Sequence, residues 1–307
     1  MKPRARRARL VDTKFRYDTQ IESQPEAVEA VLRRPVPRLD PSRPLLFCGQ
    51  GTSLHAARVA AAWAGYPALA VESQDVALRV GVPPGAQVVV VSHSGGGFTP
   101  AVLRKARAAS ATTFAVCSDA APADADHVVR TCPPERAQTH TVSYVTALAA
   151  LGQMLGLDLS NAPRLLRDAL AEPPPVDAAR RLAGKDPLLV TGFRLDAISA
   201  AEAALKLKEA TFQWAEGLSV EQALHGPQAA LRQGMGAILF VPDDDDGGRT
   251  VRLRELCATL GVEVVEIPVA RCSEAVRPLV SIVPAQRLAG EIARLTGGDP
   301  DRSRNPV

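Results

Sequence analysis

Hydrophobic and polar positions follow one another in blocks that predict strands and helices in regular alternation. Short apolar runs such as 45–48 and 88–91 suit strands covered on both faces, and Ala-rich amphipathic stretches follow them. In the first half we expect strands at 44–48, 68–72, 87–92, 113–117 and 127–131, and helices at 53–64, 99–109 and 139–155. This order indicates an α/β fold, with a parallel sheet and helices on both of its faces.

The second half repeats this plan after a connector. Between 157 and 177 the strand signal disappears, and three prolines at 173–175 end a helix. Beyond it we expect strands at 187–191, 237–241 and 263–267, and helices at 196–212, near 222, at 249–260 and around 288. Because both halves open with an apolar strand, a Gly-containing turn and an Ala-rich helix, the sequence predicts two copies of one doubly wound α/β lobe.

These patterns divide the chain into five segments. We expect an N-terminal arm and opening helix at 1–43, a first lobe at 44–160, a linker at 161–184, a second lobe at 185–297 and a C-terminal tail at 298–307.

The turn after the third strand is the strongest functional signal. It reads Ser92-His93-Ser94-Gly95-Gly96-Gly97-Phe98-Thr99 and runs into a helix. Three glycines let the backbone N–H groups point inward, and the helix directs its positive end at the same place. The turn therefore predicts a phosphate cradle.

A second turn in the same lobe supports the cradle. Gly49-Gln50-Gly51-Thr52-Ser53 follows the first strand, at the sheet edge where open α/β folds bind ligands. Alone it is most simply a tight turn with a capping Ser. Two such turns together favour an anionic ligand. Neither matches the Gly-x-x-x-x-Gly-Lys-Ser/Thr loop of nucleotide hydrolases, which favours a small sugar phosphate over ATP.

The second lobe differs at the matching place. Its third strand is followed by Pro242 and four aspartates at 243–246, whose charges would repel a phosphate. We expect only the first lobe to bind phosphate, and the acidic run to be a solvated loop or a charge cluster at a helix N-terminus.

Composition narrows the class of protein. The 307 residues are 46% hydrophobic and 22% charged with a net charge of +3, and no apolar stretch resembles a signal peptide or a membrane span. The basic run from Lys2 to Arg9 is interpreted as a solvated arm, not a nucleic-acid contact, because no groove-reading element follows it. Five scattered cysteines indicate reduced structural thiols, without a zinc-like spacing. We expect a cytoplasmic protein with no metal.

Two polar motifs of the second half are ambiguous by themselves. Lys206 and Glu209 are three residues apart on a predicted helix, so both face one side, which is most often a surface salt bridge. His225 before Gly226-Pro227 is most often a residue at a helix end.

Together these motifs carry a resemblance to a known family. The segments are Gly51-Thr52-Ser53, the loop 92–99, Ala204-Leu205-Lys206-Leu207-Lys208-Glu209 and Leu224-His225-Gly226-Pro227. In them the chain resembles the sugar isomerase (SIS) family, and within it the isomerase half of glucosamine-6-phosphate synthases. The resemblance extends from 21–27 to 299–305, and it implies two flavodoxin-like lobes.

The resemblance implies a role for each site residue. It assigns the phosphate to Thr52, Ser53, Ser92, His93, Ser94 and Thr99, with His93 where the family usually has Gln. It makes Glu209 the base that moves a proton between adjacent carbons, with Lys206 beside it. His225 would open the sugar ring from the neighbouring subunit of a homodimer. Sugar contacts are expected from Gly51, His140 and Glu216, and no cofactor is required.

The sequence also departs from the family pattern. Residue 2 is Lys where the glutaminase part of the synthase has its Cys nucleophile, so we do not expect this chain to draw ammonia from glutamine. It stops before the tail Lys that forms a Schiff base in the family, and His140 and Val142 stand where the synthase has Ser and Lys. The loop 92–99 carries two extra residues.

These features predict a phosphosugar isomerase that acts on a hexose 6-phosphate or an amino-hexose 6-phosphate. One alternative is a deaminase of glucosamine 6-phosphate or of a fructosamine 6-phosphate. Another is a non-catalytic protein that senses phosphosugars and regulates a partner, against which the presence of both Glu209 and His225 argues.

Overall fold

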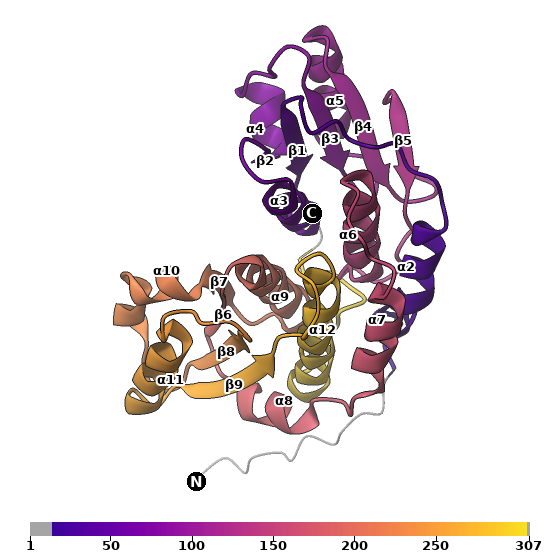
Figure 1. Cartoon of the computed structure of the whole chain (residues 1–307). Helices are drawn as coiled ribbons and strands as arrows, with labels where there is room; N and C mark the ends of the chain where they lie inside the picture. The colour runs from indigo at the N-terminus through magenta and orange to yellow at the C-terminus, as the bar shows by residue number, and fades with distance from the viewer. Residues whose placement is uncertain (1–13, 306–307) are drawn as a thin grey trace.

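The structure is a computed structural model that describes residues 14–305 (Figure 1). The basic run from Lys2 to Arg9 and the last two residues of the tail lie outside the described residues. Within the described range, no helix combines the length and the apolar character needed to cross a membrane.

The first lobe is built on a parallel sheet with the strand order β2-β1-β3-β4-β5. Its strands are β1 (Leu45–Gly49), β2 (Leu69–Glu72), β3 (Gln87–Val91), β4 (Thr112–Cys117) and β5 (His127–Arg130). Every residue of β1 and β3 is buried, as expected for central strands covered by helices on both faces. The strand order is the flavodoxin-like one.

The second lobe repeats this order with four parallel strands, β7-β6-β8-β9. They are β6 (Leu188–Gly192), β7 (Ala215–Ser219), β8 (Gly236–Val241) and β9 (Glu263–Pro268). As in the first lobe, the lobe's first strand (β6) lies between its second (β7), which is at the edge of the sheet, and its third (β8). The predicted α/β class and the two doubly wound lobes are therefore confirmed.

Helices cover the sheets of both lobes and join them. The first lobe contains α3 (Thr52–Ala64), α4 (Ser73–Leu78), α5 (Thr99–Ala108) and α6 (Val142–Met154). The second contains α9 (Leu195–Thr211), α10 (Val220–Leu224), the 3-10 turn η1 (Pro227–Ala230) and α11 (Arg249–Thr259). The remaining helices are α1 (Arg16–Glu22), α2 (Gln24–Leu32), α7 (Ala162–Ala171), α8 (Val176–Leu182) and α12 (Arg277–Thr296).

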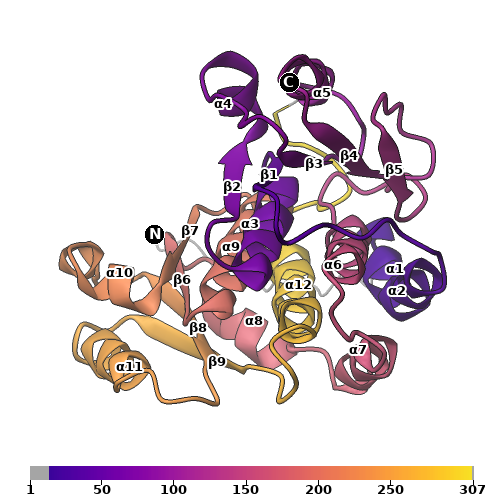
Figure 2. The same cartoon turned by 45° about the horizontal axis from the view of Figure 1, so that its top comes forward.

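A layer of helices lies between the two sheets (Figures 1 and 2). In it α3 packs on α9, and α12 packs on α9, α6, α7 and α8. One apolar core runs through this layer and includes Phe47 of the first sheet, Leu148 and Leu207 of the helices and Phe240 of the second sheet. The lobes are therefore held by a shared core, and the carboxyl ends of the first sheet face helix α9 across it.

The C-terminal segment is hydrogen-bonded to α1 and to the segment before α6. The Asp301 carboxylate accepts hydrogen bonds from the backbone N–H groups of Arg16 (2.9 Å) and Tyr17 (3.0 Å), at the N-terminus of α1. The Pro300 carbonyl accepts one from Thr139 N–H at 2.9 Å, just before α6. Figure 2 shows this yellow segment leaving α12 towards the first lobe.

Most predicted elements form within one to three residues of the expected bounds. The sequence patterns did not predict β7, α4 or α8. The helix that the prolines at 173–175 were expected to end is α7, and both α7 and α8 lie in the predicted linker 161–184. Helix α6 begins at Val142, not at 139, because the Glu135 carboxylate accepts the N–H groups of Thr141 and Ser143 and fixes the start of the helix there. Among the described residues all five cysteines are free thiols, as expected.

Candidate active site

Two turns meet at the topological switch point of the first sheet, between β1 and β3. The turn after β1 needs glycine, because a Cβ on Gly49 would lie 2.4 Å from the carbonyl carbon of Ser53 and Gly51 has φ +53°. The Gln50 side chain reaches the other turn, where its Oε1 lies 3.5 Å from the position of a Cβ on Gly97. The two predicted phosphate-binding turns are thus neighbours in space.

The loop from Ser92 to Thr99 holds its shape through its own serines. Ser92 Oγ accepts the N–H of Gly95 at 3.1 Å, and Ser94 Oγ accepts that of Gly96 at 3.3 Å. Gly95 has φ +69°, and a Cβ there would lie 2.1 Å from the Pro122 carbonyl oxygen. Thr99 is buried and opens α5.

The side chains of Thr52, Ser53, His93, His140 and Ser143 line a small cleft of the first lobe. The cleft is narrow and partly open to solvent. The lining joins α3, the phosphate loop and the segment before α6. Four residues predicted as phosphate or sugar contacts therefore share one cleft with Ser143, which the sequence did not single out.

A buried ammonium connects this region to the second lobe. The Lys206 side chain on α9 is 0% exposed, and its Nζ lies 2.7 Å from Glu209 Oε2 and 3.5 Å from Glu202 Oε1. The same Nζ donates to Thr52 Oγ1 at 3.0 Å. The predicted pair on one helix face is thus in contact, and it reaches the phosphate turn of the other lobe.

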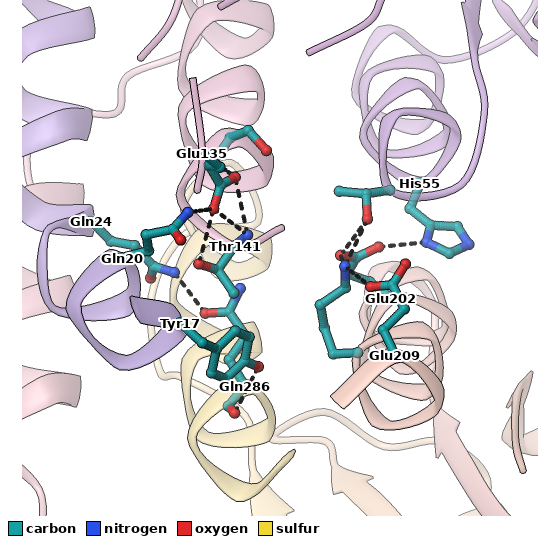
Figure 3. A network of polar contacts seen from close by, with 12 residues as sticks. Tyr17, Gln20, Gln24, His55, Glu135, Thr141, Glu202, Glu209 and Gln286 are labelled. Carbon is teal, nitrogen blue, oxygen red and sulfur yellow. Dashed lines mark hydrogen bonds and ion pairs between the residues drawn. The ribbon is translucent and has the colours of Figure 1, made fainter. Parts of the chain in front are cut away.

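Glu202 and His55 complete this cluster (Figure 3). Thr52 Oγ1 donates to Glu202 Oε1 at 3.0 Å, and His55 Nδ1 lies 2.7 Å from Glu202 Oε2. The sequence analysis missed both residues. A signal existed for Glu202, which precedes Lys206 by four positions and Glu209 by seven and so lies on the same face of an otherwise Ala-rich helix.

The charges of Glu202 and Lys206 stabilise each other. Burial would raise the pKa of Glu202, but the Lys206 ammonium and the His55 hydrogen bond outweigh it and hold that pKa below its usual value. Burial likewise would lower the pKa of Lys206, yet Glu202 and Glu209 keep it above its usual value. Glu202 and Lys206 are therefore both charged near neutral pH. Glu209, with 33% of its side chain exposed, is the carboxylate that solvent or a ligand reaches.

Two further predicted residues lie elsewhere. His225 ends α10, has 70% of its side chain exposed and pairs with Glu221 at 2.7 Å. Among the described residues it contacts neither Lys206 nor Glu209. Glu216 is exposed on β7 and lines a groove between the lobes together with Gly51 and His55.

Comparisons with known proteins bear on the family and the fold of the chain. No model of a known protein family matches the sequence. The chain is 31% identical over 310 residues to a glutamine–fructose-6-phosphate aminotransferase (isomerizing) of Acidithiobacillus ferridurans, covering 85% of this chain and 50% of that protein. It matches the solved C-terminal domain of glucosamine-fructose-6-phosphate aminotransferase from Francisella tularensis with a TM-score of 0.83 at 21% identity, covering 96% of this chain and 100% of that domain.

The chain belongs to the sugar isomerase family. It spans about half the length of the curated relatives it matches. A second solved structure with this fold is a glucosamine-6-phosphate deaminase from Thermotoga maritima, with a TM-score of 0.80 at 19% identity over 95% of this chain and 98% of that one.

In the second lobe, the turn after the first strand has the same backbone shape as its counterpart in the first lobe but different side chains. Arg194 has φ +53° and ψ −121°, nearly the conformation of Gly51 (φ +53°, ψ −128°) at the matching turn. Asp196, 2% exposed, stands near the start of α9, and Arg277 of α12 bonds Asp243 of the acidic loop at 3.0 Å. The loop is thus partly neutralised by an arginine instead of being fully solvated, while Asp246 accepts the N–H of Thr250 as a helix cap.

The first prediction concerns Lys206. Lys206→Met leaves two carboxylates without their cation, so we expect a loss of about 3–5 kcal/mol in the free energy of unfolding, measured by urea denaturation. Lys208→Met is the matched control, because Lys208 is partly exposed over Trp214, and should change stability by about 0.5 kcal/mol or less. The double variant Glu202→Gln/Lys206→Met should regain part of the loss. Equal losses for Lys206→Met and Lys208→Met would contradict this account.

The second prediction concerns Asp196. Burial, aided by Asp243, Asp244 and Glu274 and opposed by Arg277, raises the pKa of Asp196 to about 6. This pKa exceeds the value of 3.8 in the unfolded chain, so protonation of Asp196 stabilises the folded state as the pH falls from 6 to 4. At pH 7.5 Asp196 is charged, and its charge lowers the free energy of unfolding by as much as about 3 kcal/mol.

Asp196→Asn should therefore raise the free energy of unfolding at pH 7.5, and this gain should shrink below pH 6 and vanish near pH 4. Urea denaturation at these three pH values measures it. Asp177→Asn, at an exposed aspartate, is the control and should show no comparable gain. A gain that is the same at pH 4 and pH 7.5 would show that the charge of Asp196 is not the cause.

Proposed function

We propose that this chain is a phosphosugar isomerase that converts a hexose 6-phosphate or an amino-hexose 6-phosphate between its aldose and ketose forms. The observation that carries the proposal is the position of Lys206, whose ammonium contacts both the Glu209 carboxylate and the Thr52 hydroxyl of the first phosphate turn. A sugar anchored by its phosphate at that turn would extend towards Glu209. The names of the relatives, which include fructose-6-phosphate aminotransferases and a glucosamine-6-phosphate deaminase, support a phosphosugar ligand.

The anchor is assigned to the switch point of the first sheet. The N–H groups of Gly97 and Phe98, at the start of α5, have no acceptor among residues 14–305. They provide the positive helix end at which phosphates bind. Ser53, Ser92, Ser94 and Thr99 add hydroxyl groups around it. In this proposal Thr52 mainly links the anchor to the second lobe, because its hydroxyl already bonds Glu202 and Lys206.

The chemistry is assigned to Glu209. In the aldose-to-ketose direction its carboxylate takes the proton from C2 and leaves an enediolate with the negative charge on the C1 oxygen. The proton of the C2 hydroxyl then moves to the C1 oxygen, and the protonated carboxyl returns its proton to C1. No atom is gained or lost, so neither an oxidant nor an organic cofactor is needed. The Lys206 ammonium lies 2.7 Å from this carboxylate and holds it in place.

Ring opening is assigned to His225 of a second copy of the chain. His225 is exposed and makes no contact with Lys206 or Glu209 in its own copy, and an imidazole can both donate and accept a proton, as a proton shuttle at the ring oxygen requires. Its hydrogen bond with Glu221, which Arg249 also contacts, holds the ring at the surface. The proposal thus requires a homodimer with shared sites.

The test is incubation of the purified chain with fructose 6-phosphate, glucosamine 6-phosphate and a fructosamine 6-phosphate. Sugar products are followed by NMR, and free ammonia is measured in the same samples. Interconversion without ammonia supports the isomerase. Release of ammonia would show a deaminase, and binding of all three compounds without turnover would show a non-catalytic sensor.

The third prediction assigns the base. Glu209→Gln keeps the size of the side chain but removes the proton acceptor, so we expect turnover to fall by about 10²–10⁴-fold while the phosphosugar still binds. Glu255→Gln, at an exposed glutamate of α11, is the matched control and should retain full activity. Full activity in Glu209→Gln would exclude this residue as the base.

The fourth prediction tests the shared site. His225→Ala and Glu209→Gln should each be inactive as homodimers, but unfolding and refolding them together should restore activity, because one site of the mixed dimer then holds both intact residues. The measurement is the specific activity of the mixture against each parent. If the mixture stays as inactive as the parents, His225 does not act across subunits.

A further inference from the structure

The orientation of the His93 imidazole is fixed by a backbone donor. The N–H of Glu135 donates to His93 Nε2 at 2.9 Å. A nitrogen that accepts a hydrogen bond carries no proton, so the neutral ring carries its proton on Nδ1. That Nδ1 is buried and has no hydrogen-bond partner among the described residues. A buried donor without an acceptor is unfavourable unless a ligand supplies the acceptor.

The donor itself is held rigidly. The Glu135 carboxylate accepts the N–H groups of Thr141 (2.9 Å) and Ser143 (2.8 Å) at the start of α6, and it bonds the side chain of Gln20 (Figure 3). The negative charge of Glu135 therefore occupies the positive end of α6. The loop that presents its N–H to His93 cannot turn without breaking these bonds.

His140 completes an imidazole pair. Its ring lies edge-on to that of His93, with the centroids 4.8 Å apart and an interplanar angle of 64°. Both rings line the cleft that contains Thr52, Ser53 and Ser143. Burial and then His140 lower the pKa of His93, and Glu135 opposes them. The positively charged form of His93 is therefore disfavoured at this position.

Among residues 14–305, no arginine or lysine lines this cleft. Its titratable side chains are His93, His140, Cys117 and Tyr144, and burial raises the pKa of both Cys117 and Tyr144. The nearby Arg130 donates to Cys117 Sγ and to two backbone carbonyls, and Lys206 is neutralised by Glu202 and Glu209. A phosphate dianion here would thus meet hydroxyls, among them those of Thr52, Ser53 and Ser143, and two imidazoles. Of the lining residues that the structure describes, only the imidazoles can become positive.

We propose that His93 and His140 form a proton-linked anchor: the pair takes up one proton from the solvent when the phosphate dianion of the ligand binds in the cleft. This inference rests on the proposed function, because it concerns the phosphate end of the same ligand. The proton goes to His140. Protonating His93 at Nε2 would bring its N–H against the N–H of Glu135 and break that hydrogen bond.

The anchor makes binding depend on pH. Each proton taken up on binding makes the affinity rise by as much as roughly tenfold for each unit that the pH falls. The gain ends near pH 6, where the phosphate itself begins to be protonated (pKa of about 6). A phosphosugar should therefore bind more strongly at pH 7 than at pH 8.5, whereas an uncharged sugar should show no such dependence.

The experiment is isothermal titration calorimetry of the full chain with glucitol 6-phosphate, which lacks a carbonyl and cannot be isomerised. Titrations at pH 7.5 in buffers with different ionisation enthalpies give the number of protons exchanged. For the wild type we expect an uptake that approaches about one proton, and an affinity that weakens between pH 7 and pH 8.5. His140→Ser should still bind at pH 8.5 with little change but should lose the uptake.

His127→Gln is the matched control, because His127 is exposed on β5 and stacks on Phe114 away from the cleft. It should keep the uptake of the wild type. Binding without uptake by the wild type, or unchanged uptake in His140→Ser, overturns the anchor while the proposed function stands. If neither glucitol 6-phosphate nor fructose 6-phosphate binds, the proposed function fails and the anchor fails with it.

Discussion

The Lys206 ammonium is fully buried, and every feature of the candidate site depends on how its charge is balanced. An isolated buried cation is strongly unfavourable, so Glu202 and Glu209 on the same helix must remain ionised and close to it. Its third partner, the Thr52 hydroxyl, belongs to the other lobe. The contacts that balance the Lys206 charge therefore also fix where the first phosphate turn lies relative to Glu209, the proposed base.

The two lobes share a backbone and differ in charge. Gly51 and Arg194 adopt nearly the same dihedral angles, and both turns lead from a central strand into a helix. In the first lobe hydroxyls and free N–H groups follow, whereas in the second the carboxylates of Asp196 and Asp243 face the guanidinium of Arg277. The two lobes thus share one turn geometry but carry different charges at it. We expect an anion to bind only at the turns of the first lobe, because the charged groups at the second-lobe turn already pair with one another.

The sequence was sufficient for the parts of the fold that rest on local pattern. The valine run of β3 and the Ala-rich helices were predicted within a few residues, since burial on both faces requires apolar residues. Strand β7, Ala215–Ser219, has no β-branched run and was missed because its pairing with β6 defines it. Lys206 and Glu209 could be found from helical spacing. His55 and Glu135 could not, because their partners Glu202 and Gln20 lie 147 and 115 residues away along the chain.

The balance at Lys206 also bears on the phosphate end. Because that ammonium is paired with two carboxylates, it adds little net positive potential to the neighbouring cleft, and no arginine or lysine of residues 14–305 lines the space. Hydroxyls and amide N–H groups can orient a phosphate but do not neutralise it. The remaining charge must come from groups that become positive when the anion arrives. His93 and His140 can meet this requirement. Their rings are in contact, and the N–H of Glu135 fixes the tautomer of His93.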